Sequence, residues 1–394
     1  GVATVNSSGL VTAVANGGPV TFTATAGGKS GTATVTVAQV VNSVVVTPGA
    51  TTLASLGATV QLTAAILDAN GHPVAGQTVA WSSSNSGIAT IGSTGLVTAM
   101  ATGGPVTMTA TVGTKTGTAT VTVAQTVATV GVTPPATTLG AFGATAQLTA
   151  TALDANGIEV VGLPVSWSSS NSLVASVNGT GLVTAVANGG PVTITATVTG
   201  KSGTATVTVA QVVNAVTVTP ATTTLASIGA TVQLTAAATD ANGNPVAGQT
   251  VSWSSSDATN TIVTVSGTGL VTAVGNGGPV TMTATVGTKT GTATVTVAQL
   301  VTSVTITTQP GTPVQSGVTF TTVPVVTVKD ALNNGVANQA VAVSVATGSA
   351  LTFTNGTATT NASGVATFNG LSATGVIGAR TLRFTAATVQ SAPS

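Results

Sequence analysis

The sequence has very little charge, few aromatic side chains and no cysteine. Only 3% of its 394 residues are charged and 2% are aromatic, with no tyrosine. The missing cysteines exclude disulfides and thiolate metal sites, and a net charge of +1 does not attract nucleic acid or an anionic membrane. One histidine and six acids leave most of the chain without a nucleophile–base pair. We therefore expect no enzyme, no cofactor and no nucleic-acid partner.

Long hydrophobic runs are also missing, although 43% of the residues are hydrophobic. No stretch approaches the roughly 18 consecutive apolar residues of a membrane-spanning helix, so we expect no direct membrane insertion by this segment. Apolar residues instead alternate with threonine or serine, as in Val35-Thr36-Val37. Threonine and valine favour strands because they are β-branched, and 48 glycines supply turns between them. The expected fold class is all-β.

Repetition is the most prominent feature of the sequence. Trp81, Trp167 and Trp253 recur at intervals of 86 residues, and the segment Thr-Ala-Thr-Val-Thr-Val-Ala-Gln recurs with nearly the same period. Such a period is too long for a solenoid unit and suits one β-sandwich domain. The segment 103–125 is identical to 277–299, which indicates that a pair of domains was duplicated. The predicted domains are a partial copy at 1–39, full copies at 40–125, 126–211 and 212–299, and a different domain at 300–394.

Strand patterns within the repeat predict an immunoglobulin-like β-sandwich. In the copy at 126–211, alternating segments between turn residues predict seven strands, at 126–133, 144–153, 163–168, 173–177, 182–187, 191–198 and 203–210. Seven is the strand count of an immunoglobulin-like domain. In Val192–Val198 the apolar residues share one face and the threonines the other. We expect a core of small aliphatic residues around one tryptophan per domain, namely Trp81, Trp167 and Trp253.

One turn recurs in every full copy and combines an aspartate, an asparagine and a glycine. Aspartate and asparagine side chains bond to nearby backbone in such turns, and glycine accepts a positive φ. Calcium binding is an alternative, but Ca²⁺ takes six to eight oxygens and each loop offers one carboxylate and one amide. We expect no metal site and interpret these residues as structural turns: Asp68, Asn70 and Gly71; Asp154, Asn156 and Gly157; Asp240, Asn242 and Gly243.

These motifs resemble the bacterial immunoglobulin-like domain of group 2. The resemblance covers residues 1–299 and is carried by Val216-Thr217-Val218-Thr219-Pro220, Gln233-Leu234-Thr235-Ala236, Trp253-Ser254-Ser255-Ser256 and Gly269-Leu270-Val271-Thr272-Ala273. Residues 300–394 lack tryptophan and resemble the group 1 domain of intimin and invasin stalks, through Val328-Lys329-Asp330-Ala331, Asn333-Asn334-Gly335-Val336 and Ser363-Gly364-Val365-Ala366-Thr367-Phe368. Both families imply sandwiches in surface adhesins and secreted bacterial proteins, and group 2 domains also occur on phage particles. Neither implies catalytic residues.

Rows of threonine on the strands suggest a further, less favoured hypothesis. Regular Thr-x-Thr arrays on a flat sheet can order water, as in ice-binding proteins. Threonine is also an ordinary solvent-facing strand residue, and the twist of immunoglobulin sheets disfavours a lattice match. A carbohydrate-binding role is also less favoured, because the sequence shows no exposed aromatic platform.

The joins between copies predict an elongated, semi-rigid rod. The chain passes from Ala38-Gln39 through Val40-Val41-Asn42-Ser43 into the next strand without a flexible linker. We expect a structural or adhesive stalk segment outside the cell, on a bacterial surface or a virion, with neighbouring immunoglobulin-like domains as partners. The alternative is a subunit of a filament, sheath, surface layer or phage particle, in which other copies are partners. Gly1 aligns with Gly87, so the first copy is expected to lack its leading strands, either as part of a longer protein or completed by added strands.

Overall fold

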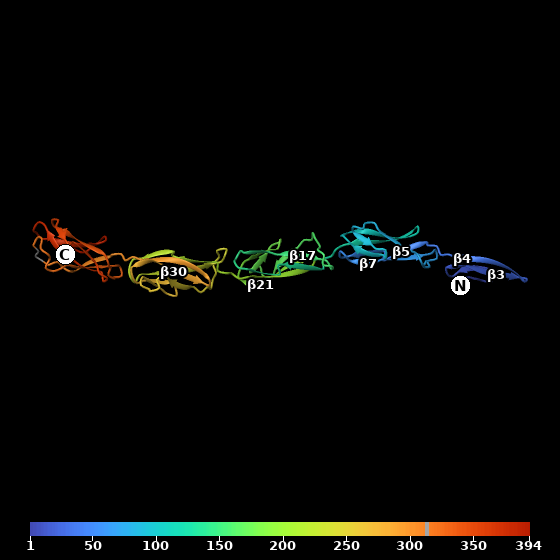
Figure 1. Cartoon of the computed structure of the whole chain (residues 1–394), viewed down its shortest axis with the longest axis horizontal. Coiled ribbons are helices and arrows are strands. Elements are labelled where there is room, and N and C mark those ends of the chain that lie inside the picture. Colours follow the sequence, from blue (N-terminus) through green and yellow to red (C-terminus); the bar gives the residue numbers. More distant parts are fainter. Residues whose placement is uncertain (312–314) are drawn as a thin grey trace. The chain divides into compact units, whose positions relative to one another are not determined.

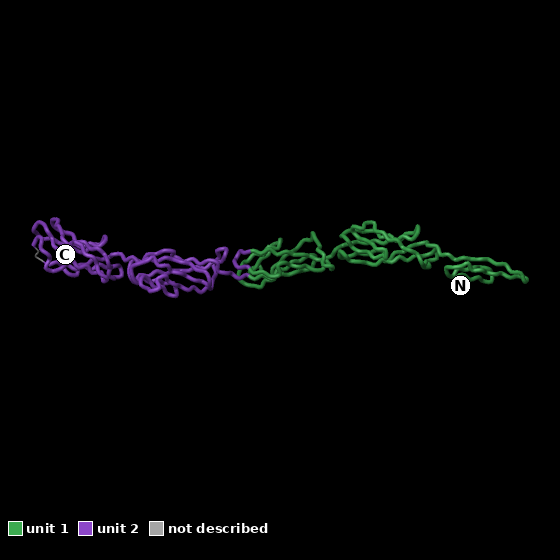
Figure 2. The backbone as a smooth tube through the Cα atoms, viewed as in Figure 1, with its two compact units in different colours: residues 1–138, 145–208 green, residues 139–144, 209–394 purple. Residues whose placement is uncertain are grey.

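The computed structural model describes residues 1–311 and 315–394, and it confirms the all-β fold class. Strands account for all of the regular structure in the described residues, which contain no helix (Figure 1). In that part of the chain, therefore, no helix is available that could cross a membrane. The chain divides into two compact units, residues 1–138 with 145–208 and residues 139–144 with 209–394 (Figure 2).

The first unit begins with a short copy of two hairpins, followed by a complete sandwich. The strands of the short copy are β1 (Ala3–Val5), β2 (Val11–Ala13), β3 (Gly17–Ala26) and β4 (Lys29–Val37). The strands of the sandwich are β5 (Ser43–Thr47), β6 (Ala50–Leu53), β7 (Thr59–Gln61), β8 (Thr63–Leu67), β9 (Ala80–Ser83), β10 (Ala89–Ile91), β11 (Leu96–Ala99), β12 (Gly103–Val112) and β13 (Lys115–Val123).

Two sheets face each other in this sandwich. One has the strand order β6-β13-β12-β9, with β6 parallel to β13. The other has the order β10-β11-β7, and β8 pairs with β5 beside it. Between the sheets lies a core of aliphatic residues in which Met108, Ala110 and Val121 have no exposed surface. Period-two alternation produces this core because every second side chain of a strand points inward.

The next two copies repeat this plan. The strands of the copy at 126–211 are β14 (Thr129–Thr133), β15 (Ala136–Leu139), β16 (Thr145–Gln147), β17 (Thr149–Leu153), β18 (Ser166–Ser169), β19 (Ala175–Val177), β20 (Leu182–Ala185), β21 (Gly189–Val198) and β22 (Lys201–Val209). The strands of the copy at 212–299 are β23 (Ala215–Thr219), β24 (Thr222–Leu225), β25 (Thr231–Gln233), β26 (Thr235–Thr239), β27 (Ser252–Ser255), β28 (Val263–Val265), β29 (Leu270–Ala273), β30 (Gly277–Val286) and β31 (Lys289–Val297).

The strand count differs from the seven predicted for residues 126–211, because the prediction missed one break within a strand and one whole strand. The strand predicted at 144–153 is interrupted at Leu148, whose amide donates to Gly181 O at 2.9 Å and whose side chain is buried. A separate strand, β15, follows β14 after Pro134 and Pro135. Proline has no N–H for a sheet ladder, so the pair ends the first strand and a new one begins.

The described part of residues 300–394 forms a sandwich with a different core. The strands are β32 (Ser303–Thr308), β33 (Val325–Lys329), β34 (Ala340–Thr347), β35 (Thr352–Thr354), β36 (Thr357–Thr359), β37 (Val365–Thr367), β38 (Ser372–Thr374), β39 (Thr381–Ala386) and β40 (Val389–Gln390). An edge-to-face pair of Phe368 and Phe384, with ring centroids 4.8 Å apart, lies among the buried aliphatic residues. These two rings supply the aromatic volume that a tryptophan supplies in the other copies.

Candidate functional site at the interdomain joints

The predicted turn residues lie where one domain meets the next. In the turn at 154–158, Asp154 Oδ1 accepts the backbone N–H groups of Asn156 and Ile158, each at 3.0 Å. Gly157 has a φ of +77°, a conformation that glycine adopts without strain. The turns at Asp68 and Asp240 have the same pattern of bonds to the residues two and four positions later.

The second carboxylate oxygen of this turn contacts the preceding domain. Asp154 Oδ2 accepts the backbone N–H of Leu56 at 3.0 Å and the side-chain amide of Gln125 at 3.0 Å. In return, Asn156 Nδ2 donates to Leu56 O at 2.7 Å. Leu56 therefore has both of its backbone polar groups bonded to the turn of the following domain. We call this arrangement of aspartate, asparagine, linker glutamine and facing backbone the joint clasp.

Two further joint clasps lie within the second unit. Asp240 Oδ2 accepts the Phe142 N–H and the Gln211 amide, both at 2.9 Å, and Asn242 Nδ2 donates to Phe142 O at 2.8 Å. Asp330 Oδ2 accepts the Ile228 N–H at 3.1 Å and the Gln299 amide at 2.9 Å. The domain at 300–394 is therefore attached in the same way as the others, although its sequence differs.

In the last joint a different asparagine makes the return bond. Asn334 Nδ2 donates to Ile228 O at 2.7 Å, and Asn334 lies four residues after the aspartate, whereas Asn156 lies two residues after Asp154. Two sequence positions in the turn can therefore supply the asparagine that makes the return bond.

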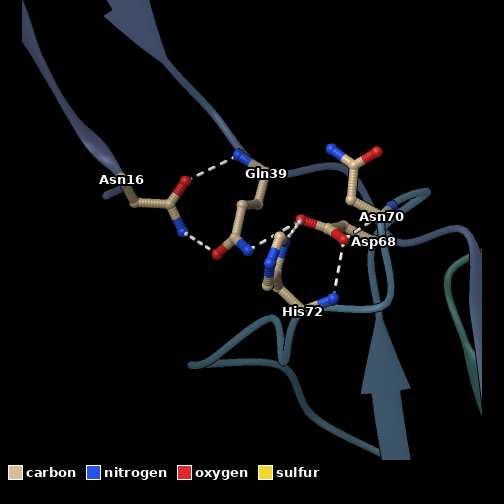
Figure 3. Close-up of polar contacts among 5 residues, drawn as sticks. All are labelled: Asn16, Gln39, Asp68, Asn70 and His72. Atoms are coloured by element: carbon tan, nitrogen blue, oxygen red, sulfur yellow. Dashed lines mark hydrogen bonds and ion pairs between the residues drawn. The ribbon is translucent and has the colours of Figure 1, made fainter. Parts of the chain in front are cut away.

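The first joint contains the aspartate and the glutamine of the clasp (Figure 3). Gln39 Nε2 donates to Asp68 Oδ2 at 2.9 Å. Asn16 orients the glutamine by two bonds, accepting the Gln39 backbone N–H at 2.6 Å and donating to Gln39 Oε1 at 2.8 Å. His72 lies beside the carboxylate with Nδ1 3.7 Å from Asp68 Oδ2, and its own side chain is largely exposed.

Hydrogen bonding holds these carboxylates in their charged form. Asp154 and Asp240 are each only 2% exposed. The Gln125 amide lowers the pKa of Asp154; burial opposes this effect, and the backbone amides of Ile158 and Leu56 reinforce it. For Asp240, burial is the largest single influence and raises the pKa, but the hydrogen bonds from the Gln211 amide and from backbone N–H groups together outweigh it, so the net shift is downward. N–H donors that favour the anion thus explain the low pKa values.

The same geometry bears on the calcium alternative. Both oxygens of Asp154 and of Asp240 face N–H donors, and a cation site requires several oxygens that face one point. No group of three or more histidine, cysteine or acidic side chains lies together in residues 1–311 and 315–394. The hydrogen bonds of the joint therefore stabilise the aspartate's own carboxylate anion.

The three tryptophans make none of the hydrogen bonds of the joint clasps. Each is half-buried at the edge of its core: Trp81, Trp167 and Trp253. Gly181, with a φ of +83°, lies against the Trp167 ring, and a Cβ there would approach the indole Cζ2 at 2.8 Å. Gln147 Nε2 fixes the same turn by donating to Leu148 O at 2.8 Å and to Thr180 O at 2.7 Å.

Sequence reasoning missed most partners of the clasp. It identified three aspartates and their asparagines as turn residues, but neither the residues that they contact nor the equivalent pair Asp330 and Asn334. A signal was present, because an apolar residue followed by glycine and a glutamine at the end of each copy recur with the period of the aspartates. These partners are Leu56, Phe142, Ile228, Gln39, Gln125, Gln211 and Gln299.

Comparison with solved structures finds a surface layer protein, an adhesin and a protocadherin among the similar chains. Surface layer protein SbsC, domains 1–6, is 21% identical over 98% of this chain and 58% of that chain, with a TM-score of 0.27. The Escherichia coli adhesin FdeC is 21% identical over 67% of this chain and 94% of that chain, with a TM-score of 0.28. Protocadherin gammaB7 EC3-6 is 14% identical over 89% and 99%, with a TM-score of 0.27. This chain thus spans 58% of the SbsC structure.

A comparison with curated protein sequences gives no match. The family model described as bacterial Ig-like domain (group 2) matches residues 40–123, 126–209 and 212–297. The three matches fall on the three complete sandwiches that share the tryptophan and the aspartate turn, and together they cover well over half of the chain. The chain therefore belongs to the family of group 2 bacterial immunoglobulin-like domain proteins.

Proposed function

We propose that this chain is a structural and adhesive stalk segment of a larger bacterial surface or secreted protein, in which it acts as a semi-rigid spacer. The joint clasp is the observation that supports this role. At Asp154, three side-chain and backbone hydrogen bonds join two domains in addition to the covalent linker. Bending at the joint has to break these bonds. The role is mechanical and non-catalytic, and the immediate partners are neighbouring immunoglobulin-like domains.

Small-angle X-ray scattering of the complete chain tests the spacer role. The parent is expected to scatter as a long, stiff particle. A variant with Asp154→Asn, Asp240→Asn and Asp330→Asn places amide N–H groups opposite the N–H donors of the clasp, so its domains should sample a wider range of orientations. Glu159→Gln removes an exposed acid near the same turn and is the matched control. A compact parent particle, or identical scattering from the parent and the triple variant, would rule out a spacer held by the clasps.

A second candidate is a subunit of a filament, sheath, surface layer or phage particle. The observation that favours it is the outer face of the hairpin β12–β13, where threonines pair across strands at Thr107 with Thr120, Thr109 with Thr118 and Thr111 with Thr116. These uncharged rows offer no electrostatic repulsion to another copy. Sedimentation that shifts to larger species with rising concentration would support this candidate, and a constant monomer would argue against it.

The finer assignments of the domains belong to the same proposal. We infer that residues 1–39 are a partial group 2 copy and that residues 300–394 are a group 1-like domain that carries the standard joint. The Asp330 bonds support the standard joint, and a core built on Phe368 and Phe384 in place of a tryptophan supports a domain type different from group 2. The proposed location is the bacterial cell surface, the extracellular space or a virion surface. Immunofluorescence on intact, non-permeabilised cells would test it.

A further inference from the structure

A cleft lies beside Trp167, away from the joint clasps. Its volume is about 390 Å³, which is within the range of small-molecule sites. It lies where the chain passes from β16, which pairs with β20, to β17, which pairs with β14. The lining residues are Gln147, Leu148, Thr149, Ala150, Val165, Trp167, Gly179 and Thr180.

The lining has an apolar floor and a polar rim. Trp167, Val165 and Ala150 are half-buried and form the floor, whereas Gln147 and Thr180 are exposed with Thr149 at the rim. No lining residue carries a charge. In the described part of the chain, neither the Trp167 indole N–H nor the Gln147 Oε1 has a hydrogen-bond partner within the protein, so a donor and an acceptor remain for a ligand.

The floor is held rigidly. Gly181 lies so close to the indole that no side chain fits between them, and the two bonds of Gln147 hold the turn at 179–181 over the ring. A rigid aromatic surface loses little conformational entropy when a ligand covers it. The cleft therefore exists before a ligand arrives.

We propose that this cleft binds a sugar unit of a neutral oligosaccharide or polysaccharide. A charged ligand would find no counter-charge in the lining, and a wholly apolar ligand would leave the Trp167 indole N–H and Gln147 Oε1 without partners. A neutral sugar meets both conditions, because its C–H face covers an indole and its hydroxyls bond to a polar rim. This inference does not rest on the proposed spacer function.

The same residue types recur in the other two complete sandwiches. The equivalents of Gln147, Thr149, Trp167 and Thr180 are Gln61, Thr63, Trp81 and Thr94 in one copy and Gln233, Thr235, Trp253 and Thr268 in the other. In both, the glutamine makes the same two bonds to backbone carbonyls. Three weak sites in one chain would bind a polymer much more tightly than a single sugar.

Tryptophan fluorescence of the complete chain tests the proposal, since all three tryptophans lie at these positions. Neutral hexasaccharides of glucose and of N-acetylglucosamine are the probes. A saturable change with a Kd of about 1 mM or tighter is expected for at least one of them. The rim variant combines Thr63→Gln, Thr149→Gln and Thr235→Gln, which extend a side chain over the cleft at Trp167 and over the equivalent positions of the other two copies. It should weaken binding at least about tenfold, or by about 1.4 kcal/mol.

The matched control makes the same substitution at strand threonines outside the cleft lining, on β13, β22 and β31: Thr120→Gln, Thr206→Gln and Thr294→Gln. The control should bind like the parent. If the rim variant melts at a lower temperature than the parent, Thr94→Gln, Thr180→Gln and Thr268→Gln on the exposed turns replace it. No response to either probe, or an equal loss in the rim and control variants, would overturn the proposal.

Discussion

A buried carboxylate in this protein is stabilised without a cationic side chain. Asp240 accepts two backbone N–H groups from its own turn, the Gln211 amide and the Phe142 N–H. Among the described residues the only basic side chain that lies against a carboxylate is His72, with Nδ1 3.7 Å from Asp68 Oδ2. Hydrogen bonds to a charged group are among the strong ones, so a chain with very few charges still obtains a directional contact between domains.

Acid should loosen the joints only well below the ordinary pKa of aspartate. The folded-state pKa of Asp154 lies below its ordinary value of 3.8, chiefly because of the Gln125 amide. The clasp therefore contributes fully to the free energy of unfolding above pH 3.8. This contribution is lost as the pH falls through the lower folded-state pKa. Carboxyl ¹³C shifts of Asp154 against pH measure this directly. A titration midpoint at or above 3.8 would contradict the hydrogen-bonded geometry.

Gly181 should tolerate no side chain, whereas Gly179 in the same turn should tolerate one. Gly181→Ala combines a positive φ with a Cβ pressed against Trp167, and we expect a loss of about 1–3 kcal/mol in the free energy of unfolding. Gly179→Ala is the control, because a Cβ there meets nothing within 4 Å. Denaturant unfolding followed by tryptophan emission separates the two. Equal stabilities would show that the turn does not pack on the indole.

At the scale of a strand, the alternating pattern predicted the structure well. The faces expected for Val192–Val198 are confirmed, because Val192, Ile194 and Ala196 are buried on the inner side of β21. The break at Leu148 and the start of β15 could not be predicted, because both depend on which sheet a segment joins. Local alternation is the same in either sheet, so it carries no information on that choice.

The two faces of β21 should respond very differently to truncation. Ile194→Ala removes a fully buried side chain and should cost about 3 kcal/mol. Thr193→Ala, next to it on the exposed face, should cost less than about 1 kcal/mol. Hydrogen exchange of the β21 amides in the complete chain measures the loss of stability in both variants. A similar cost for the two variants would mean that the strand is in a different register.

At the scale of the molecule, the repeat period predicted the domains but not how they are joined. Asp154 and Leu56 are 98 residues apart in the sequence, and the pattern around either residue describes only a turn. The turn signal of Asp154, Asn156 and Gly157 was visible in the sequence. Its second role depends on the facing loop of another domain, which only the packing of whole domains brings near.

The joints should be indifferent to calcium. The oxygens of Asp154 and Asp240 are already occupied by N–H donors, so a cation would have to displace hydrogen bonds and would find few other oxygens. Addition of calcium or of a chelator should leave the melting temperature of the complete chain unchanged. A rise in melting temperature with calcium that Asp154→Asn, Asp240→Asn and Asp330→Asn abolish would contradict this assignment.

The hairpins β12–β13 and β30–β31 have the same sequence and the same register. Each would fit the other's domain without changing one side chain, and exchange of such elements is a characteristic misfolding route of repeat proteins. The copy at 126–211 lies between them with a hairpin of different sequence. During synthesis the first of the identical hairpins can therefore complete its own sandwich before the second leaves the ribosome. The alternation of two domain types therefore separates the identical hairpins that could otherwise exchange between domains.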